Sequence, residues 1–178
     1  MKKIILLFAT ILFVACQQPT DSIASVKVDD DKTQAIQKMF ENYMAYGTDN
    51  YDPDYDQSII SDDLQGNNSI PGLEVNKDSF QETDSQHHAL FDNISMWMPG
   101  SEDGTGGGLH TNYYDEFGTW THYWGTWTGT GKFTGNQVTQ FIHLNYGWND
   151  EGKIINHNIH IDGKDFLTEL NAAQAASE

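Results

Sequence analysis

A histidine and a carboxylate stand two residues apart in the stretch IINHNIHID, near the end of the chain. His160 and Asp162 would share one face of a strand there, because side chains alternate between the two faces of a strand. His143, in the preceding stretch QFIHLNY, offers a second imidazole. In a cavity walled by aromatic side chains, burial would raise the pKa of the Asp162 carboxyl and make it a usable general acid or base. On an outer face, the same residues would be ordinary surface groups.

Asp162 also has a purely structural interpretation. Asp162-Gly163 is a common turn pair, and Asp162 could cap the last helix, with Asp165 in its first turn. Capping does not forbid catalysis, so both interpretations stay open.

The stretch WTHYWGTW packs three tryptophans, a tyrosine and a histidine into eight residues. Exposed aromatics on that scale would make a soluble protein aggregate, so they must fill a core or line a ligand cavity. On a strand, Trp120, His122 and Trp124 share one face, while Tyr123 and Trp127 lie on the other. The alternation does not show which face is inside.

A histidine on a predicted helix joins these candidates. Phe80, His87 and Phe91 recur at helical spacing in a helix expected from about residue 78 to 92, so His87 points inward with the two phenylalanines. An inward histidine can equally be a satisfied core residue. The expected ligand-pocket residues are His87, Tyr113, Trp120, His122, Trp124 and Trp127.

The elements that must position these residues follow from periodicity and turn chemistry. Helices are predicted from Asp31 to a stop at Gly47, from about 55 to 61 and from about 78 to 92, with a short final helix near Leu167. From Ile94 onward the pattern changes to strands, joined by the turns TGKFTGN and NDEGK. Three helices followed by sequentially adjacent antiparallel strands predict an α+β domain with a strongly curved sheet, and the loop GSEDGTGGG could serve as a lid.

The composition limits the classes of ligand that the protein is expected to bind. The net charge is −17 and all nine basic residues are lysines, which argues against nucleic acid as a partner and favours a neutral, apolar or cationic ligand. The spacing of Asp52, Asp54, Asp56 and Asp63 is typical of a calcium loop, but Gln57 stands where that loop needs glycine. The histidines also lack convincing ligand spacing, so we expect neither a metal nor a cofactor.

The N-terminus, MKKIILLFATILFVACQQPT, has the layout of a secretory signal peptide. Its FVAC segment resembles a bacterial lipobox, which implies cleavage after residue 15, lipidation of Cys16 and anchoring in the cell envelope, with the outer membrane the expected one. Cleavage by the ordinary signal peptidase is the alternative. With cleavage after residue 15, residues 16–30 would be a flexible tether, residues 31–172 the domain and residues 173–178 a tail.

The order of motifs resembles the SnoaL-like polyketide cyclase branch of the nuclear transport factor 2-like superfamily. The aromatic strand WGTWTG, the glycine hairpin, the EGKI turn, the terminal Asp162 and the final helix carry this resemblance, together with the first helix AIQKMFENYM and the segment HALFDNIS. The resemblance implies a cone-shaped barrel, in which a curved sheet wraps about three N-terminal helices around a pocket, and often a dimer formed through the sheet. It also implies that Asp162 is the proton shuttle, with His160 or His143 as its partner.

Two functions remain. One is an envelope-anchored domain that binds a small, mainly apolar molecule and performs cofactor-free acid/base chemistry of the cyclase, isomerase or dehydratase type. The other is a non-catalytic carrier or protein-interaction lipoprotein with the same fold.

Overall fold

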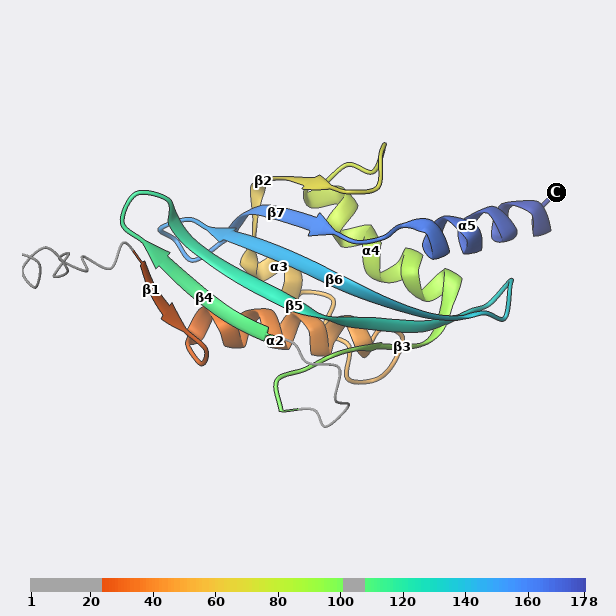
Figure 1. The fold of residues 1–178 in the computed structure, drawn as a ribbon, viewed down its shortest axis with the longest axis horizontal. Coiled ribbons are helices and arrows are strands. Elements are labelled where there is room, and N and C mark those ends of the chain that lie inside the picture. The colour runs from red at the N-terminus through yellow and green to blue at the C-terminus, as the bar shows by residue number, and fades with distance from the viewer. Residues whose placement is uncertain (1–23, 101–107) are drawn as a thin grey trace, which may run out of the picture.

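The computed structural model describes residues 24–100 and 108–178, and the chain folds into one curved sheet with helices against it (Figure 1). Four helices lie in the described part: α2 (Asp31–Met44), α3 (Tyr55–Ile59), α4 (Lys77–Leu90) and α5 (Lys164–Ala176). The strands are β1 (Ala24–Lys27), β2 (Ile60–Asn68), β3 (Phe91–Met96), β4 (Gly108–Tyr114), β5 (Gly118–Gly131), β6 (Gln137–Trp148) and β7 (Ile154–His160).

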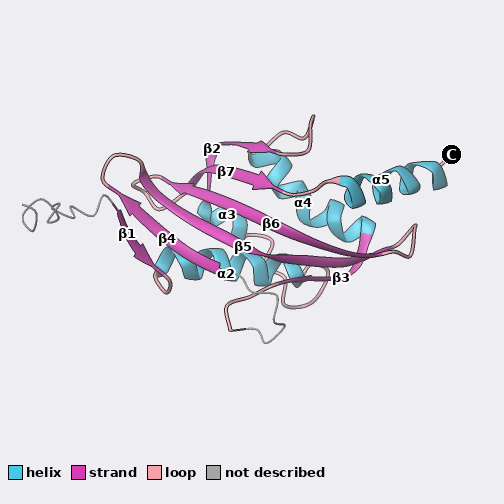
Figure 2. Cartoon of the chain, in the orientation of Figure 1, coloured by secondary structure: helices cyan, strands magenta, loops and turns pink. Residues whose placement is uncertain are grey.

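The seven strands form a single open sheet in the order β1-β4-β5-β6-β7-β2, and β3 pairs with part of β5. Every pairing is antiparallel except that of β2 with β7. The long strands β5 and β6 form the backbone of the sheet, and their curvature carries it around the helices (Figure 2). The predicted α+β class and curved, mostly antiparallel sheet are confirmed.

Helices α2 and α4 each begin at a side-chain cap, whereas α5 begins after Gly163 without one. Asp30 accepts a hydrogen bond of 2.8 Å from the backbone N–H of Thr33 at the start of α2. Asn76 and Ser79 form a capping box at the start of α4. These caps fix where α2 and α4 begin, and therefore which of their side chains face the sheet.

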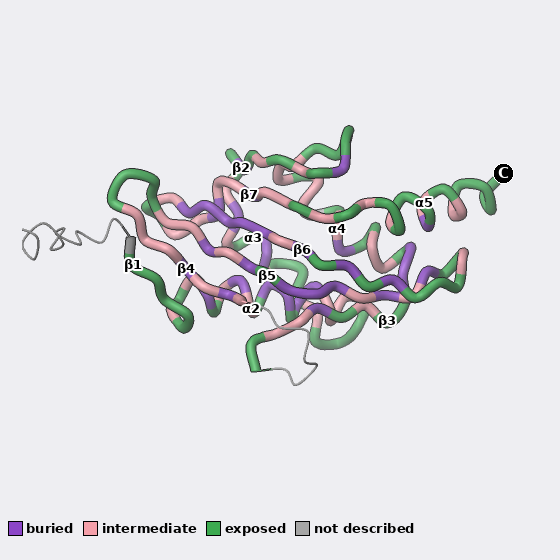
Figure 3. Tube along the Cα trace, in the orientation of Figure 1, coloured by how far each residue is buried: buried purple, intermediate pink, exposed green. Residues whose placement is uncertain are grey.

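The core lies between α2 and the inner face of the sheet, where β5 and β6 are most deeply buried (Figure 3). Ile36 and Phe40 of α2 pack against Tyr123 and Tyr146, with Phe40 and Tyr123 in edge-to-face contact at 4.6 Å between ring centroids. Gly125 makes room for this arrangement, because a Cβ there would come within 2.3 Å of the Tyr123 hydroxyl oxygen. The inner face is thus the one that carries Tyr123 and Trp127.

Several boundaries differ from the sequence prediction. β1 lies within the segment expected to be a flexible tether and pairs with β4. β2 forms in a segment where the sequence analysis predicted no strand. α5 continues to Ala176, through most of the predicted tail. Cys16, the signal peptide and most of the predicted lid lie outside the described residues. Among the described helices, none is long and apolar enough to cross a membrane.

Candidate ligand cavity

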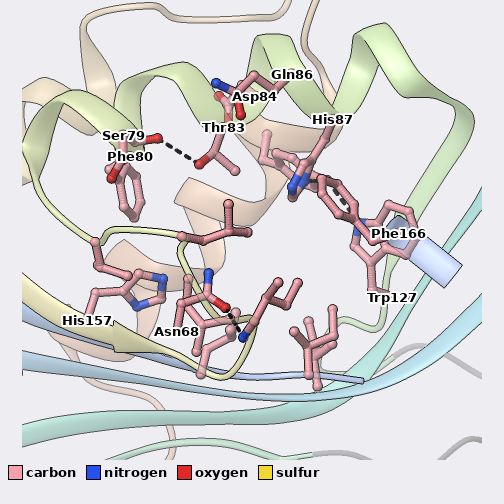
Figure 4. Close-up of a pocket in the computed structure, with 18 of the residues that line it drawn as sticks. Asn68, Ser79, Phe80, Thr83, Asp84, Gln86, His87, Trp127, His157 and Phe166 are labelled. Carbon is pink, nitrogen blue, oxygen red and sulfur yellow. Dashed lines mark hydrogen bonds between the residues drawn. The ribbon is translucent and has the colours of Figure 1, made fainter. Parts of the chain in front are cut away.

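A cavity of about 560 Å³ lies between the inner face of β5–β7 and the helices α2 and α4. Phe166 and Leu170 of α5 close part of it. Figure 4 shows His87, Trp127 and Phe166 together at one end, and His157 with Asn68 at the other. Most of the wall is aliphatic or aromatic, so burial of apolar ligand surface would drive binding here.

A three-residue polar group lies at the Trp127 end. Trp127 Nε1 donates to the Tyr43 hydroxyl at 2.9 Å, and that hydroxyl lies 2.9 Å from His87 Nδ1. Because an indole N–H can only donate, Tyr43 accepts from Trp127 and is free to donate its own hydrogen to His87. Burial lowers the pKa of His87 to about 4, so the ring is neutral, and a Tyr43 hydroxyl that donates to Nδ1 selects the tautomer with the proton on Nε2.

Two carboxyl groups form an acidic pair in the wall. Asp56 comes from the short helix α3 and Asp84 from the middle of α4, and both side chains line the cavity. Asp56 is 9% exposed and Asp84 is 6% exposed. The Tyr51 hydroxyl donates a weak hydrogen bond of 3.4 Å to Asp84 Oδ2, and Asp56 Oδ1 has no hydrogen-bond partner in the described chain.

The environment of this acidic pair raises the pKa of both carboxyl groups toward neutral pH. Burial raises the pKa of Asp56 to about 7, and the charge of Asp84 adds to the shift. Burial also raises the pKa of Asp84 to about 6, against the opposing effect of the Tyr51 hydrogen bond. Near pH 7 the pair therefore holds both an ionised and a protonated carboxyl group, the combination required of an acid/base catalyst.

The opposite end of the cavity carries a second neutral imidazole. The His157 ring stacks on Tyr146 with 4.5 Å between centroids, and Phe80 contacts it edge-on. Burial lowers the pKa of His157 to about 4. Within the described residues, no group of three or more His, Cys, Asp or Glu side chains could hold a metal ion.

The structure places two of the sequence-predicted pocket residues, His87 and Trp127, in the cavity wall. Trp120, His122 and Trp124 do not line it, because they share the opposite, outer face of β5. Tyr113 is also absent from the wall and bonds instead to Asp30, the N-cap of α2. Assigning those four residues to the pocket is therefore corrected.

The three residues predicted to be catalytic also lie away from the cavity. His143 and His160 face each other across β6 and β7 on the outer face, with 5.5 Å between their ring centroids. Asp162 is exposed, and its Oδ1 accepts a hydrogen bond of 3.1 Å from the backbone N–H of Lys164, at the start of α5. None of the three lines the cavity, so this geometry gives them no contact with a molecule bound there.

Sequence reasoning missed Asp56 and Asp84 as members of one site. The sequence indicates Asp56 only through the calcium-like spacing. A signal for Asp84 did exist, because it lies between Phe80 and His87 at helical spacing and so shares their inward stripe. No comparable pattern pointed to Asp56, whose position depends on how α3 packs against α4.

Comparisons with known proteins agree with the fold. No protein-family model matches the sequence, and no curated protein matches it. Among solved structures, BvnE pinacolase from Penicillium brevicompactum superposes with a TM-score of 0.58 at 11% identity, covering 85% of this chain and 100% of that protein. A Jannaschia sp. CCS1 protein assigned to the SnoaL-like polyketide cyclases gives a TM-score of 0.56 at 9% identity, covering 80% and 92%.

A third structure is a Catenulispora acidiphila DSM 44928 protein with a ketosteroid isomerase-like fold, in complex with trimethylamine. It gives a TM-score of 0.50 at 8% identity and covers 71% of this chain and 84% of its own. At these identities the likeness is one of fold alone. The chain thus has the fold of the SnoaL-like and ketosteroid isomerase-like proteins.

Proposed function

We propose that this chain binds a small, mainly apolar molecule in the cavity beneath the sheet. The observation that carries the proposal is the cavity itself, whose walls are largely aliphatic and aromatic and whose volume of about 560 Å³ suits a small molecule. The similar structures support it, since one of them is of a pinacolase and another holds a small organic molecule.

Native mass spectrometry of the purified domain tests this directly. The expected result is a mass increment that disappears on denaturation and that identifies a small molecule by fragmentation. Binding of an apolar naphthyl probe, followed by quenching of the intrinsic tryptophan fluorescence, provides a second measurement that needs no knowledge of the natural ligand. Absence of both the increment and any saturable probe binding contradicts the proposal.

Proton transfer is a second candidate function, and the Asp56–Asp84 pair favours it. With pKa values raised to about 7 and 6, one carboxylate can take a proton from an acidic C–H while the other carboxyl returns one. A tetralone is a suitable probe, because its acidic α C–H exchanges with deuterium once an ionised carboxylate removes the proton and an enolate forms. Exchange followed by NMR should be faster with the protein than with the Asp56→Asn variant.

We further propose that the domain is anchored in a bacterial envelope by lipid on Cys16. The support is the sequence alone: a short apolar run after two lysines, ending in FVAC. Metabolic labelling with a fatty-acid analogue should mark the full-length protein and leave the Cys16→Ser variant unlabelled. A labelled Cys16→Ser variant, or an unlabelled wild-type chain exported in soluble form, contradicts the anchor.

We also propose that two copies associate through the outer face of β4–β7. Those four strands contain no Asp, Glu, Lys or Arg, although the chain carries a net charge of −17. Trp124 is 45% exposed on this face and Phe141 is 62% exposed. A charge-free face with exposed aromatic side chains lets two strongly acidic copies meet without facing carboxylates, which supports a homodimer.

A further inference from the structure

Asp56 is buried in the cavity wall with fewer hydrogen bonds than an ionised carboxylate can accept, since the Asn42 side chain donates to it but one oxygen is left over. Its side chain lines the cavity and is 9% exposed, and its Oδ1 has no partner among the described residues. Asp84 lines the same cavity, and the 3.4 Å bond from Tyr51 is weak for a carboxylate. An ionised carboxylate buried in this way is unfavourable unless a hydrogen-bond donor or a cation binds to it. Asp56 and Asp84 together therefore form a site that can bind a ligand group with N–H or O–H donors.

The described part of the chain, residues 24–100 and 108–178, offers no cation to fill that role. No lysine lines the cavity, and the sequence contains no arginine. The ion pairs found in the described chain join Lys77 to Asp62 and Lys132 to Asp92, and none of these four residues lines the cavity. The two imidazoles that line it, His87 and His157, are neutral, since burial lowers the pKa of each to about 4.

The rest of the wall suits an organic cation with an apolar body. Aromatic rings surround the space, and their faces attract cations more strongly when water is excluded. The strongly negative net charge also draws cations toward the protein. The aromatic residues of the wall are Phe40, Tyr43, Phe80, Trp127, Tyr146 and Phe166.

We propose that the cavity takes a molecule with a protonated amine on an apolar body, and that the ammonium group binds to Asp56 and Asp84. The ammonium N–H groups donate to the carboxylates of Asp56 and Asp84, both of which line the cavity, while the apolar body lies along the aromatic wall. This inference rests on the proposed function, because it names the class of ligand that the same cavity binds.

Binding of this kind is coupled to proton release. The titratable groups that face the pair are Asp52 beside α3, Tyr51, Tyr55, Tyr146 on β6 and Tyr43 on α2, none of which is cationic. An ammonium group favours the ionised form of both carboxyls, so it lowers pKa values that are about 7 and 6 in the free protein. Near neutral pH, part of the pair is protonated before binding, and that proton leaves when the amine enters.

Three probes with one naphthyl body and different charges test the inference: naphthylethylamine, the neutral naphthylethanol and the anion naphthylpropionate. Affinities are measured by isothermal titration calorimetry at about pH 8, where the acidic pair is mostly ionised. The amine should bind at least about tenfold more tightly than the alcohol, and the anion should bind most weakly. Titration at neutral pH in two buffers of different ionisation enthalpy should reveal proton release for the amine alone.

Two variants locate the effect. Asp56→Asn and Asp84→Asn should each reduce the preference for amine over alcohol several-fold. Glu82→Gln is the matched control, because Glu82 is an exposed carboxylate on the same helix as Asp84. Equal affinity of amine and alcohol, or an amine preference that survives both substitutions, overturns the inference while leaving the cavity as a ligand site. Failure of all three probes to bind counts instead against the proposed function.

Discussion

Tyr43 and His87 are joined by a hydrogen bond of 2.9 Å between helices α2 and α4, at one end of the cavity. The same hydroxyl accepts a bond of 2.9 Å from Trp127 Nε1 on the sheet. The Tyr43 hydroxyl thus links helices α2 and α4 to the inner face of the sheet. Burial raises the pKa of Tyr43 above its usual value, so the hydroxyl stays protonated. This end of the cavity depends on the link, because the two hydrogen bonds fix the side chains of His87 and Trp127.

Replacing Tyr43 by Phe should destabilise the fold without filling or emptying the cavity. The substitution leaves Trp127 Nε1 without its acceptor and His87 Nδ1 without its donor, and each unsatisfied buried group costs about 1–3 kcal/mol. Urea denaturation should show the loss in the free energy of unfolding. Tyr46→Phe is the control, because the Tyr46 ring packs on Tyr51 and its hydroxyl makes no hydrogen bond within the described chain. Equal stability of the two variants contradicts the role given to Tyr43.

Stability should respond to pH through Asp56. Its pKa in the folded protein, about 7, lies above the ordinary value of 3.8, so the folded state binds more protons than the unfolded state between these limits. The contribution of Asp56 to stability therefore falls as pH rises from about 4 to 7 and stays unfavourable above that. At about 1.4 kcal/mol per pKa unit, Asp56→Asn should stabilise the fold by on the order of 2–4 kcal/mol at pH 8 and little at pH 4.

The measurement is the difference in unfolding free energy between variant and wild type across this pH range. Glu82→Gln should give a nearly flat difference, because Glu82 is exposed. A flat difference for Asp56→Asn as well would show that its carboxyl titrates normally in the folded protein.

The sequence predicted much of the fold because local signals and packing agree along most of the chain. The periodicity of Ile36, Met39 and Phe40 marks the face of α2 that is buried, and the predicted sharing of faces on β5 matches the structure. β2 was missed because SDDLQGNN is polar and its strand conformation comes from parallel pairing with β7, a contact with no local signal.

The candidate site was harder to predict, because both faces of β5–β7 carry aromatic and polar side chains. His157 and Ile159 of β7, and Ile161 just after the strand, line the cavity from the inner side. The catalytic prediction relied instead on His160 and Asp162, which alternate with them and belong to the other side. The alternation of side chains along a strand predicts which residues share a face, but it does not show which face is inside. The helices decide the orientation, since they cover only one face.

Filling the cavity should abolish ligand binding. Leu144 lines the cavity from β6, and Leu144→Trp would place an indole in the space that the ligand needs. The affinity for naphthylethanol should fall by at least about tenfold, which corresponds to about 1.4 kcal/mol. Phe141→Trp is a matched control on the same strand, because Phe141 points outward and is 62% exposed. Circular dichroism checks that both variants fold, and unchanged binding by a folded Leu144→Trp variant would place the ligand elsewhere.

Association through the outer face of β4–β7 should depend on pH, because histidines lie on it. Four histidines cross it on adjacent strands, with centroid distances of 5.4 Å for His110–His122, 6.0 Å for His122–His143 and 5.5 Å for His143–His160. Burial and the neighbouring imidazoles lower the pKa of His143 to about 4, so the ring is neutral at pH 7. Protonation would place positive charges side by side on both copies of a dimer that meets through this face, and would therefore oppose association.

Sedimentation velocity should accordingly show a dimer near pH 7 that dissociates as the pH falls toward 4, where the pKa of His143 lies. Phe141→Lys should give a monomer at pH 7, because a cation at the centre of the charge-free face would be buried without a partner. Phe133→Lys is the comparison, since Phe133 is similarly exposed but lies on the β5–β6 turn rather than within these strands. A dimer that persists in Phe141→Lys would show that the copies meet through another surface, and a monomeric wild-type chain would show that this face serves another purpose.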